Sequence, residues 1–519
     1  MSKRHRLGKQ NIKDQRKKRN KAHFQLRRIQ KNAGLIAPPS TTIANGKCSY
    51  DNVEEEQAAR QDAVTQQIKV YRSMLPTLLK RLAKIKDPRN PKKIKHKMTV
   101  LLIYGILCFA FHMSSRREAT REMTRPMFME NLRRLFPELE DLPHHDTLAR
   151  ILDKINVNEI EQAHIDMIRH LIRNKKFLSY LVSSCYPIAI DGTQKFKRSY
   201  LWDEECLERK VRTKKKTEDD SEEPEEKKQY YVYVLEANLA FQNGMVIPLL
   251  SEILSYTEGD SDRNKQDCEQ KAFKRLAARL KNAFSHLPIM VLLDGLYPNG
   301  PIMEICHKNN WDFMIVLQDD SLPSVQEEIE KLKTIQKKNR LHQTWGNRNQ
   351  FFQWVSDIDY RYICPITKKE KKQLLHVVIC EENWQEIAPD SAETVTKKSK
   401  HVWVSANPLH KRTVHERCNL GARHRWGIES SILVEKHQGY QYEHCFSYNW
   451  EIMRGYHYLM RMAHALNVLA RHSYALAKYV RDLGVQGLIA FIRNTIASPW
   501  IDADDLHEIA TTPCQLKLE

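Results

Sequence analysis

The sequence has few of the features that mark secreted or membrane proteins. Its eleven cysteines stand singly, with no Cys-x2-Cys pair, which indicates reduced cytosolic thiols rather than a disulfide framework. The first residues are basic and contain no apolar block, so no secretory signal is expected. The longest apolar run, residues 98–111, has fourteen residues and falls short of the ~20 that a membrane span needs. We therefore expect a cytoplasmic protein without a membrane partner, and a buried helix at residues 98–111.

What the chain has in excess is positive charge. It carries 84 Lys and Arg against 64 Asp and Glu, a net charge of +20. Such a balance indicates a polyanionic partner, because Lys and Arg release the counterions that a polyphosphate condenses. Charge alone would also fit a ribosomal or a membrane-surface protein. At 519 residues the chain has room for two to four domains.

The N-terminal segment is the most basic part of the chain. Residues 1–31 contain thirteen Lys or Arg and one acid, Asp14, with too few apolar side chains to form a core. We predict that residues 1–62 are a disordered basic arm and linker, and that the arm lies along DNA phosphates. The alternative is a solvated tail.

Helical periodicity dominates residues 63–181. Ile68, Tyr71 and Leu75 recur at steps of three and four residues, which is typical of an amphipathic helix. Asp146 or Thr147 is the expected N-cap of a helix that continues through Leu152. His144 and His145 are interpreted as turn residues before that helix rather than as site residues.

The candidate site begins with three charged residues of one predicted helix, residues 424–436. The spacing of four from Arg425 to Glu429 and of seven from Glu429 to Lys436 places all three on one face. Ile428, Ile432 and Leu433 would anchor the helix to a core. Taken alone, this pattern also fits an exposed, salt-bridged helix face.

Two aspartates further upstream share a second pattern. Asp191 and Asp294 each end a short apolar run and are followed by glycine, which places each carboxylate where a buried strand meets its turn. Two strand-end aspartates and one helix glutamate are a suitable oxygen ligand set for two divalent metal ions in phosphoryl transfer.

Together these stretches resemble the DDE transposases of bacterial insertion sequences, in the group with the signature Tyr-x2-Arg-x3-Glu-x6-Lys. Arg425, Glu429 and Lys436 match that signature in spacing, whereas Ala422 stands in place of its tyrosine. The resemblance includes Asp191 and Asp294 with the residues that follow them. It covers roughly residues 70–475, and residues 142–152 resemble part of the helical accessory domain of this group.

The resemblance implies an α/β fold with a ribonuclease-H-like mixed sheet, an N-terminal all-α domain and a mainly β insertion. The expected order is three strands, a helix, a strand, a helix and a strand, with a solvated hairpin tip at residues 203–228. The catalytic core would comprise residues 182–318 and 406–482, the insertion residues 319–405, and the C-terminal tail residues 483–519. In some relatives an aromatic residue of the insertion holds a flipped base. Trp345 and Trp354 are the candidates here, with core packing as the alternative.

The implied chemistry is metal-dependent DNA cleavage at the element ends, followed by transfer of the 3′-OH into target DNA. Asp191, Asp294 and Glu429 would be the catalytic, metal-binding residues, and Arg425 and Lys436 would bind DNA. The cofactor would be Mg²⁺ or Mn²⁺, with two ions. The expected partners are end DNA, target DNA and a second copy of the chain in a synaptic complex at the nucleoid.

Two other functions remain open. One is a ribonuclease-H-like nuclease without strand transfer, and the other is a non-catalytic DNA-binding or regulatory derivative.

Overall fold

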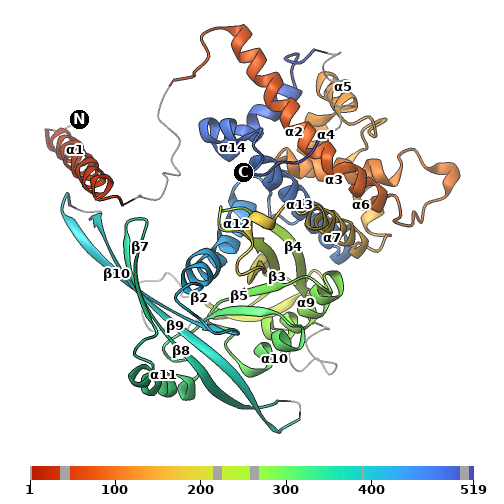
Figure 1. Ribbon diagram of the computed structural model, residues 1–519. Coiled ribbons are helices and arrows are strands. Elements are labelled where there is room, and N and C mark those ends of the chain that lie inside the picture. Colours follow the sequence, from red (N-terminus) through yellow and green to blue (C-terminus); the bar gives the residue numbers. More distant parts are fainter. Residues whose placement is uncertain are drawn as a thin grey trace. The chain divides into compact units, whose positions relative to one another are not determined.

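The computed structural model describes residues 3–35, 47–213, 225–256, 268–365, 367–388, 391–502 and 514–519 (Figure 1). The chain forms two compact units. The first unit comprises Met1–Thr42 and Leu293–Ala422, and the second comprises Ile43–Leu292 and Arg423–Glu519. The chain thus leaves the second unit at the end of one strand and returns to it just before the predicted glutamate helix.

The second unit begins with helices, as the periodicity predicted. They are α2 (Val53–Leu82), α3 (Met98–Ala110), α4 (Arg116–Met123), α5 (Pro126–Leu135), α6 (His145–Leu152) and α7 (Asn158–Arg173). Helix α2 begins ten residues before residue 63, because Asn52 caps it by accepting from the Glu55 N–H at 2.8 Å. Helix α3 is the buried apolar run that was predicted at residues 98–111.

The predicted N-cap of α6 is wrong. His144 occupies that position, and its ring nitrogen Nδ1 accepts from the Asp146 N–H at 3.3 Å. Asp146 instead lies in the first turn, where a carboxylate is favoured by the helix dipole. His144 is therefore a turn residue, as predicted, and His145 opens the helix.

Five strands of the second unit are β1 (Tyr186–Arg198), β2 (Leu207–Thr213), β3 (Glu225–Ala240), β4 (Val246–Leu254) and β5 (Ile289–Leu293). Strand β1 pairs antiparallel with β3 and parallel with β5, while β2 and β4 both pair with β3. The apolar runs of β1 and β5 are buried on both faces, which is typical of the parallel strands of an α/β sheet. Helix α9 (Glu269–Ala283) packs against β3 and β4.

The charged run at residues 203–228 differs from the prediction. Strand β2 and the start of β3 pair with each other, from Leu207 opposite Tyr231 to Thr213 opposite Glu225. Alternating charged residues can occupy such a two-stranded ribbon because one face of it stays in water. The part of the predicted tip at residues 214–224 lies outside the described residues.

Three helices complete the second unit: α12 (Trp426–His437), α13 (Trp450–Arg471) and α14 (Ala477–Ile496). Helix α13 is buried along almost its whole length and packs against α3, α7 and β4. The predicted tail at residues 483–519 is wrong in part, since α14 continues to Ile496 and buries Leu488, Ile489 and Ile492. Near the C-terminus, Leu518 forms a main-chain bridge with Ser473.

The first unit is mainly β between residues 319 and 405, as predicted for the insertion. Its strands are β6 (Asp312–Val316), β7 (Arg340–Trp345), β8 (Arg348–Ile363), β9 (Glu370–Ile387) and β10 (Thr394–Ser405). They pair antiparallel in the order β6-β10-β9-β8-β7. Helix α10 (Gly300–Lys308) precedes β6, so the predicted order of helix, strand, helix and strand after β4 is present. Helix α11 (Pro323–Ile335) packs against β8. Trp354 is 4% exposed and belongs to the core of this unit, whereas Trp345 is half-buried at the end of β7.

Residues 3–32 form helix α1 (Lys3–Asn32), so the prediction of a disordered arm is wrong for them. The helix lies beside β9 of the same unit (Figure 1), with Leu26 and Gln30 buried and Gln30 Nε2 donating to the Gln385 carbonyl at 3.3 Å. Lys, Arg and Gln are good helix formers. Packing on β9 buries Leu26, which the basic segment has too few apolar side chains to bury by itself. None of the described helices is both long and apolar enough to cross a bilayer.

Candidate active site

The two predicted aspartates belong to neighbouring parallel strands: Asp191 lies within β1, and Asp294 follows β5 directly. In the register of β1 and β5, Ala189 is the partner of Leu292. Asp191 stands two residues after Ala189, and Asp294 stands two residues after Leu292. Both carboxylates are partly buried. The two acids thus belong to neighbouring strands, as predicted. The prediction that Asp191 ends its strand is wrong, because β1 continues to Arg198 and Asp191 is paired with Glu236 within it.

Close packing explains why each aspartate is followed by glycine. A Cβ atom on Gly192 would lie 2.6 Å from Cε1 of Tyr233, and a Cβ on Gly295 would lie 2.5 Å from the Gln318 side chain. Both distances are far below van der Waals contact. In each case the main chain just beyond the carboxylate has room for a hydrogen atom only, within strand β1 after Asp191 and in the turn after Asp294.

Glu429 lies in the first turn of α12, which packs against β1, β3 and β4. Ile428 and Ile432 are buried, as predicted, but Leu433 is 54% exposed. The buried stripe runs through Ile428, Ile432 and Glu435 instead, at helical spacings of four and three. Glu429 stands beside this stripe with its side chain 37% exposed, so it is anchored through its helix and open to solvent.

Arg425 and Glu429 form the predicted ion pair. Arg425 NH2 lies 2.9 Å from Glu429 Oε1, and the arginine side chain is only 7% exposed. The remaining donors of this guanidinium, Nε and NH1, are buried and have no hydrogen-bond partner among the described residues. A buried donor without a partner is costly, which fits a guanidinium that is prepared for an anion.

Lys436 departs from the predicted charged stripe. Its Nζ lies 3.1 Å from Glu443 Oε1, and its side chain is 16% exposed. It therefore pairs with the turn after α12, while the stripe predicted from spacing is observed only between Arg425 and Glu429. Ala422, at the signature tyrosine position, is 3% exposed in a 3-10 turn just before the helix.

The structure does not by itself join all three acids. Asp191 and Glu429 belong to the second unit. Asp294 belongs to the first unit, near the start of the segment Leu293–Ala422. Among the described residues, the one group of three or more His, Cys, Asp or Glu side chains with ligand atoms within 4.8 Å of one another is His144, His145 and Asp146. The assembly of Asp191, Asp294 and Glu429 into one metal site therefore stays a prediction.

Sequence reasoning missed a buried ionic network beneath α12. Glu435 is fully buried, and its carboxylate accepts from Arg461 NH1 at 2.9 Å and contacts His464 Nδ1 at 2.6 Å. Arg461 also lies 3.1 Å from Glu236, which is the β3 register partner of Asp191. Burial by itself would raise the pKa of Glu435, but Arg461 and His464 hold it below its usual value. Burial raises the pKa of Glu236.

A second cation enters this network from β1. Lys195 is buried, and its Nζ donates to the Tyr442 carbonyl at 3.0 Å. Burial lowers the pKa of Lys195 to about 8. The Tyr442 hydroxyl in turn donates to Glu236 at 2.9 Å. Two cations and two carboxylates thus tie α12 to β1, β3 and α13 on the face that carries Asp191.

The turn after α12 supplies a test of this packing. Gly439 has a φ of +101°, and a Cβ atom there would overlap the ring of His112. That ring packs edge-on against Tyr440, with ring centroids 4.5 Å apart. We expect Gly439→Ala to destabilise the second unit by more than ~1 kcal/mol, because alanine is strained at positive φ and the histidine must move.

Thermal unfolding of Gly439→Ala would check this expectation against Gly34→Ala. Gly34 also has a positive φ, of +73°, but a Cβ there would meet nothing within 4 Å. The control therefore reports backbone strain alone. Equal losses in the two variants would show that the His112 contact contributes nothing.

Comparison with known proteins adds one family match. Residues 79–168 match the family described as DDE_Tnp_1-associated. The match lies within the helical segment in front of β1. No curated protein matches the sequence. Among solved structures, the chain is similar to a piggyBac transposase synaptic complex with hairpin DNA, at 9% identity and a TM-score of 0.36, with 87% of this chain and 85% of that chain covered.

Proposed function

We propose that this protein is a DDE transposase that cleaves DNA at the ends of a mobile element and joins the freed 3′-OH to target DNA. The observation that carries the proposal is the match of residues 79–168 to a DDE-transposase-associated family. That segment directly precedes the strand that leads to Asp191. The remaining arguments concern what the residues of the site can do.

The three carboxylates fit divalent metal ions of the magnesium class. All three donors are hard oxygens. Asp191 lies within β1, Asp294 directly follows the neighbouring parallel strand β5, and Glu429 is partly exposed on a helix that packs on β1. When bound, such ions would activate water for attack on a phosphodiester and stabilise the leaving oxygen. The chain itself supplies a rigid support, because β1 and β5 are buried on both faces.

Arg425 and Lys436 would hold DNA phosphates near this site. Arg425 has two unpartnered buried donors, and a guanidinium binds phosphate through parallel hydrogen bonds. Lys436 is held by Glu443, so a phosphate would compete with one exposed carboxylate for it. We propose for both residues the phosphate-binding role that the sequence resemblance implied.

The proposal also covers the partners, the fold class and the origin of the protein. A synaptic complex needs two DNA ends, and we propose that two copies of the chain bring them together. The ribonuclease-H-like assignment and the origin in a bacterial insertion sequence belong to the same proposal. Short inverted repeats closely flanking the coding region would support that origin.

Helix α1 is proposed to follow the DNA backbone. Arg16, Lys17, Lys18 and Arg19 are exposed, and they precede the part of the helix that docks on β9. Replacing these four residues by glutamine keeps a good helix former at each position. If all four contact phosphates, the slope of log affinity against log salt should become shallower by up to about 3.6, at about 0.9 per contact.

Filter binding of duplex DNA over a range of salt concentrations would measure this slope. The matched control replaces Lys331 and Lys333 of α11, which are already paired with Glu328 and Glu330, by glutamine. The control should leave the slope unchanged. An unchanged slope in the α1 variant would leave α1 as a docked helix without a role on DNA.

The experiment that tests the proposed function follows both chemical steps in one reaction. Labelled DNA that carries the element ends is incubated with the protein, Mg²⁺ and an unlabelled target plasmid. A transposase gives a nicked end and a covalent product in which the label has joined the plasmid. Nicking without a joined product would favour the nuclease alternative, and binding without nicking would favour the regulatory derivative.

A further inference from the structure

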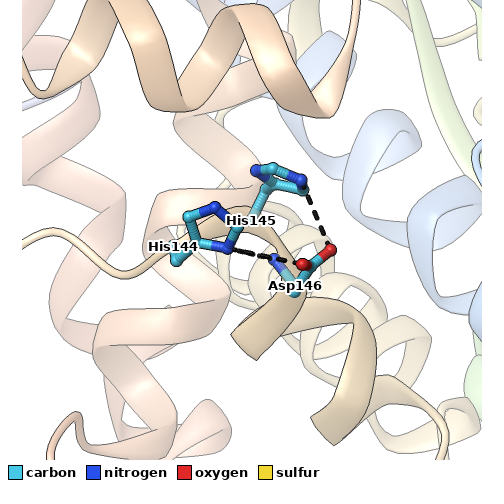
Figure 2. Close-up of side chains that lie close together, drawn as sticks. All are labelled: His144, His145 and Asp146. Atoms are coloured by element: carbon cyan, nitrogen blue, oxygen red, sulfur yellow. Dashed lines mark hydrogen bonds and ion pairs between the residues drawn. The ribbon is translucent and has the colours of Figure 1, made fainter.

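Three consecutive residues at the start of α6 turn their side chains toward one another (Figure 2). His144 precedes the helix, and His145 and Asp146 are its first two residues. One ligand atom of each lies within 4.8 Å of the others, a grouping that no other three His, Cys, Asp or Glu side chains make within the described part of the chain. None of the three belongs to the proposed DNA-cleaving site.

The distances within this cluster are long for direct hydrogen bonds between charged groups. His144 Nδ1 lies 3.6 Å from Asp146 Oδ2, and His145 Nε2 lies 3.3 Å from Asp146 Oδ1. Charge-assisted hydrogen bonds are usually about 2.7–2.9 Å long. Two ligands that each lie about 2.0–2.1 Å from one tetrahedral ion are separated by about 3.3–3.4 Å. The 3.3 Å separation of His145 Nε2 and Asp146 Oδ1 matches that spacing, and the 3.6 Å separation of His144 Nδ1 and Asp146 Oδ2 is slightly longer than it and too long for a direct hydrogen bond.

A hydrogen bond to Nδ1 fixes the orientation of the His145 ring, as is common for a metal-binding histidine. Its Nδ1 lies 2.9 Å from Thr120 Oγ1 of α4, and the same oxygen accepts from the His145 backbone N–H at 3.2 Å. When Nδ1 carries the proton, Nε2 directs a lone pair toward Asp146. Metal-binding histidines are commonly fixed in this way by a second hydrogen bond. The His144 side chain is 57% exposed, so an ion could reach the cluster from solvent.

We propose that His144 Nδ1, His145 Nε2 and the Asp146 carboxylate bind one first-row transition-metal ion of the zinc class, with water completing the coordination and with the ion taking the place of the 3.3 Å cap bond that His144 Nδ1 accepts from the Asp146 N–H. Two imidazoles and one carboxylate favour Zn²⁺ over Mg²⁺, which prefers oxygen ligands alone. The bound ion would clamp the start of α6, and through Thr120 it would also hold α4. Both helices belong to the segment that matches the transposase-associated family.

A titration with Co²⁺ tests this proposal on the full-length protein. After treatment with a chelator, the protein is titrated with Co²⁺ at pH 7.5. Visible absorption reports Co²⁺ with nitrogen ligands, and Zn²⁺ should displace it. We expect one Co²⁺ per chain, bound independently of Mg²⁺.

Two kinds of variant separate metal binding from helix capping. His144→Asn keeps a strong N-cap residue but removes an imidazole ligand, and we expect it to weaken Co²⁺ binding by about 100-fold or more. Thr120→Val removes the support of His145, which should cost about 10- to 100-fold in affinity. Circular dichroism of each variant would check that it is folded.

Two controls remove candidate ligands elsewhere. His170→Asn deletes an exposed histidine of α7 that contacts Asn174, and Asp191→Asn alters the proposed DNA-cleaving site. Both should bind Co²⁺ like the wild type. The proposal is overturned if the wild type binds Co²⁺ no more tightly than His144→Asn, or if Asp191→Asn removes the signal. Because the readout does not depend on activity, failure of the proposed transposase function would leave this test unaffected.

Discussion

Glu429→Gln is expected to stop metal-dependent nicking of DNA while DNA binding is retained. Glutamine keeps the length of the side chain and its helix propensity, but it removes the negative charge that Asp191, Asp294 and Glu429 are proposed to share against two divalent cations. A neutral amide oxygen is a poor ligand for such ions. Nicking should fall by on the order of 10³ or more, as when one member of a catalytic unit is removed.

Asp191→Asn and Asp294→Asn should cause losses of similar size, and the losses should not add when the changes are combined. If the three carboxylates act as one unit, removing any one of them already disables it. Additive losses would instead mean that the acids act separately. The assay is Mg²⁺-dependent nicking of DNA that carries the element ends, with binding of the same DNA measured in parallel.

The chain offers a close control for Glu429→Gln. Glu56 forms an ion pair of the same i,i+4 kind with Arg60, at 2.7 Å, and is 33% exposed, against 2.9 Å and 37% for the pair of Arg425 and Glu429. Glu56→Gln therefore removes a comparable surface ion pair, worth about 1 kcal/mol or less. If Glu429→Gln nicks DNA at the wild-type rate, Glu429 is only an exposed salt-bridge residue, which is the alternative that its sequence pattern also fits.

Short-range patterns in the sequence were sufficient to locate the candidate site residues. The apolar runs before Asp191 and Asp294 predicted buried strands because β-strands bury such runs, and β1 and β5 are neighbours in the sheet. The pattern did not predict that β1 continues past Asp191 to Arg198. The four-residue spacing of Arg425 and Glu429 predicted a helical ion pair, which is present. These features depend on residues that are close in sequence or on strands that are buried as a whole.

The features that the sequence did not predict depend on partners far away along the chain. Residues 3–32 contain too little apolar surface to fold by themselves, and the burial of Leu26 depends on β9, some 350 residues later. Leu433 was predicted to be buried because it is apolar, but Glu435 occupies the buried stripe of α12 in its place. A glutamate at that position is stable only with Arg461 and His464 beside it.

This buried glutamate leads to the second large expected effect. In Arg461→Met the side chain remains similar in volume, but Glu435 and Glu236 lose the cation that contacts both of them. Removing one partner of a buried ionic cluster typically costs about 3–5 kcal/mol, because the remaining charges are buried without compensation. We therefore expect α12 and α13 to open locally far more often in this variant.

Native-state hydrogen exchange measures such opening directly. It is preferable to a single unfolding midpoint, because a chain with two compact units need not unfold in one step. A loss of 3–5 kcal/mol corresponds to exchange that is roughly 100- to 4,000-fold faster at the protected amides of α12 and α13, since each 1.4 kcal/mol is a factor of ten. Arg454→Met on the same helix is the control, because Arg454 pairs with Glu451, which is 42% exposed.

A third variant distinguishes lost charge balance from lost packing. Combining Arg461→Met with Glu236→Gln and Glu435→Gln removes Arg461 and both carboxylates together, and it leaves polar groups that can still form hydrogen bonds. The second cation, Lys195, can then lose its charge, because burial already lowers its pKa to about 8. Replacing a whole buried ionic cluster is often close to neutral, so most of the protection should return. If the triple variant exchanges as fast as Arg461→Met, the stability of α12 depends on the shape of the arginine rather than on its charge. In that case the position of Glu429 above β1 would be maintained by packing alone.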